Sequence, residues 1–158
     1  MRNALLRSVV LTCACLIARP AAGVVEYRDV GELTRQARQI VIGDVSDVTS
    51  SWNADHSLIR SRITIEVADY LYGQGPGREV LDLAGGTVGD LTLHVSVLPT
   101  FEAGDHVLLF LADNEIRLVE SFQGAYLTDG EQIARMAPDC RRVIPSSAQP
   151  LSSFLREI

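Results

Sequence analysis

The stretch Val107-Leu108-Leu109-Phe110-Leu111 limits the folds open to this chain more than any other feature of the sequence. It follows a turn containing Gly104 and Asp105, and no polar side chain interrupts it. Successive side chains of a β-strand point to opposite faces of the sheet, so a strand of this composition is apolar on both faces. Each of the two faces of such a strand must be covered by another part of the protein. We expect residues 107–111 to form the central strand of a small β-domain, between a barrel interior and a second layer.

The first residues have the pattern of a secretory signal peptide. Arg2 and Arg7 give a positive start, the apolar run 8–18 follows, and small residues come after Pro20. The run is shorter than the ~20 residues of a membrane-spanning helix. We expect residues 1–23 to be a signal peptide, cleaved near Ala22 or Gly23, and the mature protein to be secreted or periplasmic. A buried N-terminal helix is the structural alternative.

Removal of this leader makes the chain more acidic. The whole chain has a formal charge of −6, and the leader contains three arginines and no acid, which leaves about −9. An acidic domain lacks the basic surface that nucleic acids and anionic membranes require, so neither is expected as a partner. Cys13 and Cys15 leave with the leader, in mid-run positions that argue against lipidation. Cys140 is then alone, so the core and not a disulfide framework must supply stability.

The remaining signals predict an all-β fold. Asp29, three residues before Glu32, is a helix N-cap in capping-box spacing and predicts a short helix at 30–38. A strand as long as 58–72 must coil to stay packed in so small a protein, which favours a barrel over a flat sheet. Gly43 marks a bulge or a close backbone approach. The expected strands are 40–48, 58–72, 79–83, 91–97, 107–111 and 116–120, with 122–127 closing the β-region.

These signals divide the mature chain in two. Residues 24–128 are expected to form the β-barrel domain with its N-terminal helix. From Asp129 the pattern loosens, and residues 129–158 are expected to form a C-terminal extension that packs on the barrel and ends in a helical turn within 150–158.

The order of signals between residues 40 and 127 resembles a family of uncharacterised exported bacterial proteins. Ala84 stands where the family usually has proline, and Tyr72 where it usually has a basic residue. The resemblance implies a small OB-like or netrin-like β-barrel, and some members appear beside matrixin-type metalloproteases. It implies no activity and no catalytic residues. The matching segments are 41–45, 51–52, 63–67, 84–89, 101–111 and 121–126.

Chemistry-bearing residues are few. His94 lies on the polar face of one expected strand, and Asp105 and His106 begin the next, so the three are weak candidates for a partial metal site. Their spacing matches no metal-ligand motif, and two surface histidines are the simpler interpretation. The sequence contains no Gly-x-Ser-x-Gly elbow and no His-Glu-x-x-His motif. No cofactor and no catalytic residue are predicted.

Binding is therefore the expected role. Trp52, the only tryptophan, sits among polar loop residues, where an aromatic side chain either anchors a partner or caps the barrel end. Phe101, Gln123 and Tyr126 are further binding candidates, with core packing as the favoured alternative. The main hypothesis is a non-enzymatic exported domain that holds a protein or extracellular ligand with loops at one barrel end. The alternatives are a metalloprotease inhibitor or accessory factor, and a small metal-dependent hydrolase.

Overall fold

The computed structural model describes residues 26–113, 117–136 and 148–158. The predicted leader and Cys140 lie outside these residues. The elements in chain order are α2 (Val30–Gln36), β1 (Gln39–Trp52), β2 (Ile59–Tyr72), β3 (Arg78–Ala84), β4 (Gly86–Val88), β5 (Leu91–Leu93), β6 (His106–Leu111), the 3-10 helix η1 (Ser121–Gly124), β7 (Ala125–Thr128), β8 (Gln132–Arg135), β9 (Gln149–Pro150) and α3 (Leu151–Phe154). None of the described helices is long and apolar enough to cross a bilayer.

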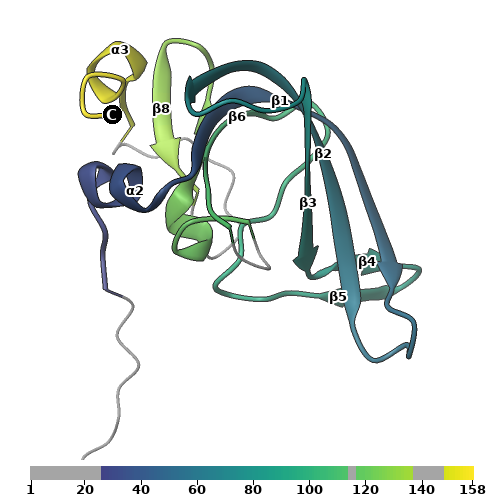
Figure 1. Cartoon of the computed structure of the whole chain (residues 1–158). Helices are drawn as coiled ribbons and strands as arrows, with labels where there is room; N and C mark the ends of the chain where they lie inside the picture. Colours follow the sequence, from purple (N-terminus) through teal and green to yellow (C-terminus); the bar gives the residue numbers. More distant parts are fainter. Residues whose placement is uncertain (1–25, 114–116, 137–147) are drawn as a thin grey trace, which may run out of the picture.

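The predicted all-β class is confirmed, but the sheet does not close into a barrel. Seven antiparallel strands follow the order β3-β2-β1-β6-β7-β8-β9, so β3 and β9 remain as edges. The sheet curls strongly, and β4 and β5 pair separately beside the lower ends of β1 and β2 (Figure 1). Closure would require the two edges to pair, and β9 contributes only two residues.

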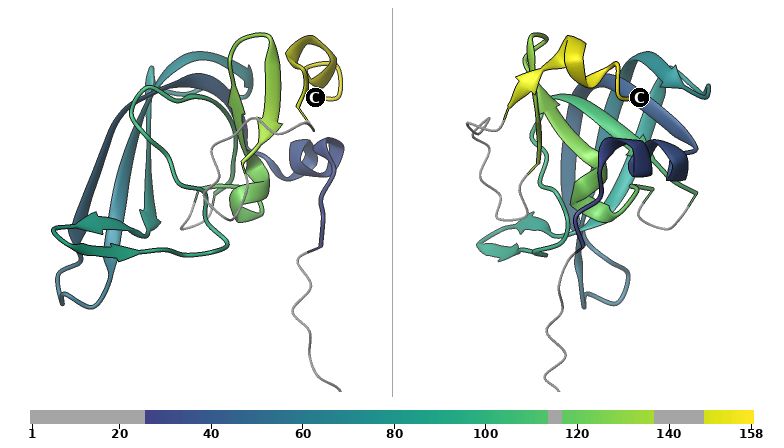
Figure 2. Two further views of the ribbon diagram at one scale, coloured as in Figure 1. Left: turned by 180° about the vertical axis from the view of Figure 1, so that it is seen from behind. Right: turned by 90° about the vertical axis from the view of Figure 1, so that its left-hand side faces the viewer.

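Strand β6 is covered on both faces, as its sequence predicted. Val107, Leu109 and Leu111 join the core inside the curled sheet, which we call the inner core. Leu108 and Phe110 face the other way, into a second core beneath α2 and α3, which we call the outer core. Both helices lie beside β8 on the same side of the sheet (Figure 2). The expected second layer is therefore this pair of short helices.

The two long strands form the curl. β1 and β2 each contain 14 residues, and their pairing shifts register at three points, one of them between Ile42 and Gly43. A Cβ on Gly43 would lie 2.3 Å from the Glu66 carbonyl oxygen, so the predicted close backbone approach is confirmed. The last shift, between Val45 and Asp47, reverses which residues of β1 face inward. Bulges of this kind bend a strand and increase its twist.

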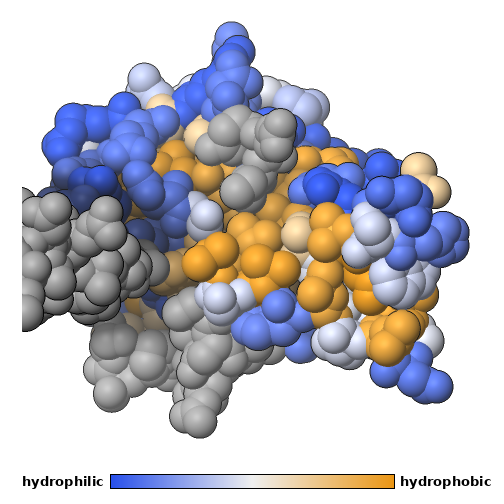
Figure 3. Space-filling model, turned by 90° about the horizontal axis from the view of Figure 1, so that it is seen from below, coloured by the Kyte–Doolittle hydropathy of each residue, from blue (hydrophilic) through white to orange (hydrophobic). Residues whose placement is uncertain are grey.

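The predicted strand 91–97 is shorter than expected. Strand β5 ends at Leu93, and Leu91 and Val97 are 60% and 46% exposed, so their alternation does not mark a buried face. The glycine-rich connection before it contains β4, where Gly86 has φ +118° and a Cβ would lie 2.2 Å from the Ser61 hydroxyl. This hairpin therefore crosses directly over the ends of β1 and β2. Figure 3 views this end of the molecule, where apolar surface gathers among hydrophilic residues.

The chain around β6 differs from expectation at both ends. The predicted strand 116–120 includes residue 116, outside the described residues, and of the rest only Leu118 makes a bridge, to Leu111. Beyond Asp129, the chain adds β8 and β9 to the same sheet. At the start of α2, Asp29 accepts a hydrogen bond from the Glu32 amide (2.8 Å), which confirms the predicted N-cap.

A buried carboxylate joins edge strand β3 to the segment after β6. The Glu79 side chain is 4% exposed and lies 3.0 Å from the Arg117 guanidinium, while the Tyr70 hydroxyl donates to it at 2.8 Å. Burial and this hydrogen bond raise the pKa of Tyr70 to about 12. An inward-pointing charge on an edge strand also discourages pairing with a foreign strand. These side-chain contacts thus connect edge strand β3 to a segment with which it has no backbone pairing.

Candidate functional site: a groove beside Trp52

Trp52 ends β1 at the turn into β2. Its half-buried indole stacks on the His56 ring, with centroids 6.1 Å apart and planes 23° from parallel. The loop between them is held by its own side chains. The Asn53 amide oxygen accepts from the Ser57 and Leu58 amides, at 3.0 and 2.9 Å. Ser57 also donates from its hydroxyl to Asp55 (2.8 Å), which helps to lower the Asp55 pKa below its ordinary value. The tryptophan is therefore presented by an ordered loop.

A groove of about 370 Å³ runs from this loop across the outer face of the sheet. Side chains two residues apart on a strand share a face, so Thr49 and Ser51 of β1 lie beside Arg62 and Arg60 of β2. Arg62 is in turn opposite Asp82 of β3. The full lining is Thr49, Ser51, Trp52, Asn53, Arg60, Arg62 and Asp82.

The two arginines of the groove differ in their partners. The Arg60 guanidinium donates to the Asp82 carboxylate from Nε (2.7 Å) and to the Asp82 carbonyl oxygen from Nη2 (2.9 Å). Arg62 is exposed, and its guanidinium makes no hydrogen bond or ion pair with any described residue. Thr49 donates its hydroxyl to Asp47 (2.7 Å). The lining thus carries one positive charge that no lining carboxylate compensates, in a protein that is acidic as a whole.

The other predicted binding residues lie inside the protein. Phe101 packs in the inner core. Tyr126 packs in the outer core, with its ring centroid 4.8 Å from that of Phe154. Burial raises the Tyr126 pKa, although the nearby Arg135 opposes the shift. Gln123 is buried and fully engaged: its oxygen accepts from the Arg28 amide (2.8 Å) and its nitrogen donates to the Glu26 carbonyl (2.9 Å).

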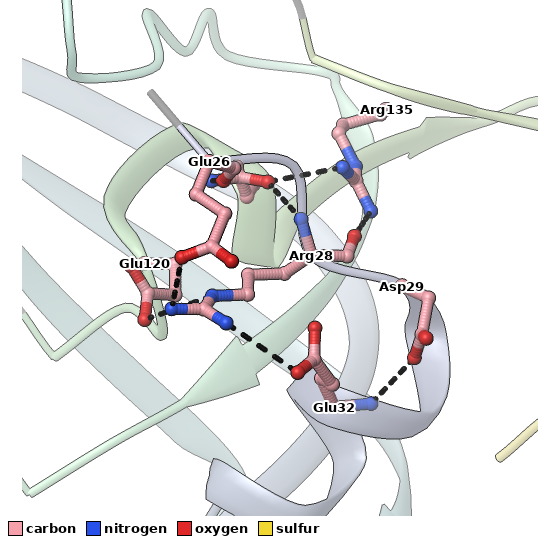
Figure 4. A network of polar contacts seen from close by, with 7 residues as sticks. Glu26, Arg28, Asp29, Glu32, Glu120 and Arg135 are labelled. Carbon is pink, nitrogen blue, oxygen red and sulfur yellow. Dashed lines mark hydrogen bonds and ion pairs between the residues drawn. The ribbon is translucent and has the colours of Figure 1, made fainter. Parts of the chain in front are cut away.

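Gln123 belongs to a polar network that fixes the chain entering α2. Figure 4 shows Arg28 and Arg135 of this network with their acidic neighbours. Arg28 lies 3.0 Å from Glu26, 3.4 Å from Glu32 and 3.7 Å from Glu120. The Arg135 guanidinium donates to the Arg28 carbonyl (2.7 Å). All of these contacts are internal to the protein. We therefore assign the network to holding residues 26–29 against β7 and β8, and not to ligand binding.

The three metal candidates do not form a metal-binding group among the described residues. His106 pairs through Nδ1 with Asp44 on the neighbouring strand, and Asp105 accepts from the Glu102 amide (2.8 Å). His94 borders a small cavity of about 40 Å³ at the end of the inner core. Among residues 26–113, 117–136 and 148–158, no three His, Cys, Asp or Glu side chains lie close enough to share a metal ion.

The sequence predicts Trp52 as a binding residue but does not identify the groove that it lines. Arg60, Arg62 and Asp82 are polar positions on alternating strands, and alternation does indicate an outward face. What places them around Trp52 is the pairing register of β1, β2 and β3, which depends on the register shifts in β1. The signal available in the sequence was the pair of arginines two residues apart in a strand that starts beside the tryptophan.

Comparison with known proteins found no matching family model, no similar curated protein and no similar solved structure.

Proposed function

We propose that this protein is an exported, non-enzymatic binding domain that holds its ligand in the groove beside Trp52. One observation carries the proposal: the groove combines a half-buried tryptophan with a cation that has no partner among the described residues. Aromatic and arginine side chains are the types that most often dominate binding energy at protein surfaces. An arginine without an internal partner is available to pair with a ligand.

The ordered loop supports the same proposal. Hydrogen bonds within residues 53–58 hold the stack of Trp52 on His56 in one arrangement before any ligand arrives. A site that is already ordered loses less conformational entropy when it binds. The remaining lining side chains stand on paired strands, which position them more precisely than a mobile loop does.

The proposal also includes the export, the fold class and the identity of the ligand. The leader pattern at residues 1–23 supports export, and the intact mass of the exported protein should correspond to a start near Val24. The strongly curled antiparallel sheet supports assignment to the OB-like and netrin-like class. A secreted metalloprotease remains one candidate ligand, suggested by the family resemblance alone.

Retention on an affinity column tests the binding function. Wild-type protein, Trp52→Ala and Arg62→Gln are immobilised in equal amounts and exposed to the surrounding medium of the native cells. Arg38→Gln is the control, since Arg38 is an exposed arginine outside the groove. We expect a component that wild type and the control retain and both groove variants lose. Equal retention by all four proteins would contradict the proposal.

A further inference from the structure

We propose that the ligand of the groove is an acidic saccharide, in which a sugar ring packs on Trp52 and its carboxylate pairs with Arg62. This inference rests on the proposed binding function and adds the chemical class of the ligand. It concerns a single groove on the outer face of β1, β2 and β3.

The lining favours a hydrophilic ligand. Small-molecule sites are usually lined by aliphatic and aromatic side chains with a few polar groups. Here the proportion is reversed: six of the seven lining residues are polar or charged, and the seventh is Trp52. An apolar ligand would leave these polar groups without water and without partners, at a cost of about 1–3 kcal/mol for each neutral group. A ligand rich in hydroxyl groups replaces the lost water instead.

Trp52 selects among hydrophilic ligands. Indole is a large, flat apolar surface with one polar N–H, so it packs against a ligand that also has a flat apolar face and a polar rim. A pyranose ring has this character, because its axial C–H bonds form an apolar patch and its hydroxyls point outward. The surrounding groups supply both kinds of hydrogen-bonding partner: the Ser51 hydroxyl donates and accepts, the Asn53 amide nitrogen donates, and the Asp82 carboxylate accepts.

Arg62 adds a preference for charge. Its guanidinium is a planar fork that matches a carboxylate in two parallel hydrogen bonds. The neighbouring Arg60 already donates to Asp82 from two nitrogens, so the charge of Arg60 is compensated within the groove. A phosphate monoester would also pair with a lone arginine, but it carries about −1.5 to −2 charges at pH 7, and the groove offers only one uncompensated cation. A monovalent carboxylate on a sugar ring matches that charge.

The size of the groove fits one or two sugar units. Its volume of about 370 Å³ lies near the lower end of the range for small-molecule sites, about 300–1,000 Å³. The negative charge of the whole protein opposes an acidic ligand at long range. Salt screens this repulsion beyond about 8 Å at physiological ionic strength, while the contact with Arg62 is shorter than that.

Matched trisaccharides provide the test. Hexuronate trisaccharides of gluco, manno and galacto configuration are each compared with the neutral trisaccharide of the same linkage, in which CH₂OH replaces the carboxylate. Binding to the full mature chain is followed by calorimetry and by the fluorescence of Trp52, the only tryptophan. We expect at least one uronate to bind at least tenfold more tightly than its neutral partner. The emission of Trp52 should change on binding.

Variants locate the interaction. Arg62→Gln should weaken the uronate about tenfold and remove the preference over the neutral sugar, because only the charged contact is lost. Trp52→Ala should weaken both sugars to a similar degree. Arg38→Gln, an arginine outside the groove, should change neither. Circular dichroism and unfolding midpoints must show that each variant remains folded.

The outcomes separate this proposal from the function it rests on. If no uronate binds, or if each binds no better than its neutral partner, the saccharide assignment is wrong. A glutamate-rich pentapeptide that binds with dependence on Arg62 while the uronates do not would assign the groove to acidic peptides. Both results leave the binding function intact. That function fails separately, if the groove variants retain native components as wild type does.

Discussion

The same sheet has two regions that are covered differently. In the helix-covered half, formed by β6, β7 and β8 with α2 and α3, both faces of the sheet are buried. In the open wing, formed by β2, β3 and residues 47–52 of β1, the inner face is buried and the outer face, apart from Leu71 at the end of β2, meets solvent. The candidate groove lies on the open wing. A face without a covering layer is where this fold has room for a ligand.

Strand β1 shows the difference within one element. Ile40 lies in the core beneath the helices, whereas Thr49 and Ser51 are exposed on the outer face. The register shift between Val45 and Asp47 separates the two parts. The change from apolar to polar outer residues along β1 therefore follows where α2 and α3 end. Both halves contribute their inner face to the core, but only the outer face of the open wing can carry polar side chains at little cost.

The largest expected effect tests where stability resides. Phe110→Ala removes a ring that is fully buried between β6 and the helices, and it should lower the free energy of unfolding by about 3–5 kcal/mol. Val80→Ala, an apolar truncation on the exposed face of β3, is the matched control and should cost less than about 1 kcal/mol. Urea unfolding measures both. Similar losses would show that the two regions do not differ in this way.

The second prediction concerns the contact that joins the two regions. Arg117→Met leaves the buried Glu79 carboxylate without its ion-pair partner and should cost about 2 kcal/mol, reduced from the value for a fully buried pair because Arg117 is 40% exposed. Arg38→Met breaks the exposed pair with Asp113 and should cost less than about 0.5 kcal/mol. Adding Glu79→Gln to Arg117→Met should recover part of the loss. Equal costs for the two arginines would show that the Arg117–Glu79 ion pair stabilises the fold no more than the exposed Arg38–Asp113 pair does.

The third prediction tests the start of the covering layer. Asp29→Ala removes the N-cap of α2 and should cost about 1 kcal/mol, while Asp29→Asn keeps an oxygen acceptor and should be nearly neutral. Thermal unfolding distinguishes the two variants. If both are equally destabilised, the charge of Asp29 and not its hydrogen bond matters.

The smallest expected effect is a pH dependence in the open wing. Because the pKa of Tyr70 is raised to about 12, the folded state keeps this phenol neutral, while an unfolded tyrosine ionises near pH 10. The stability that the neutral Tyr70 phenol contributes below pH 10 should therefore be lost as the pH rises from 10 to 12. Tyr70→Phe should lose less stability over this range than wild type. Tyr72→Phe, at an exposed position, is the control and should behave like wild type. Tyr70→Phe should still lose some stability at high pH, because the Tyr126 pKa is also raised.

The groove could not have been predicted from the sequence in the same way as the central strand. Two-sided burial of residues 107–111 follows from composition alone, because neither face of such a strand tolerates water. The position of Arg62 beside Trp52 depends on the pairing of three strands and on bulges that no local pattern fixes. Phe101 and Tyr126 were binding candidates in the sequence but are buried in the structure. An aromatic residue in a turn-rich segment has the same sequence signal whether it is buried or exposed.

The sequence by itself determined the β class, the central strand, the capped helix near residue 30 and the alternation of strand β2. Each of these depends on side chains a few residues apart, so local periodicity contains the necessary information. Only the tertiary structure decided that the sheet stays open, that residues after 129 extend it, and that an arginine and a tryptophan from different strands share a groove. These features depend on contacts between distant segments, where register and edge pairing select one arrangement among several that the local pattern permits.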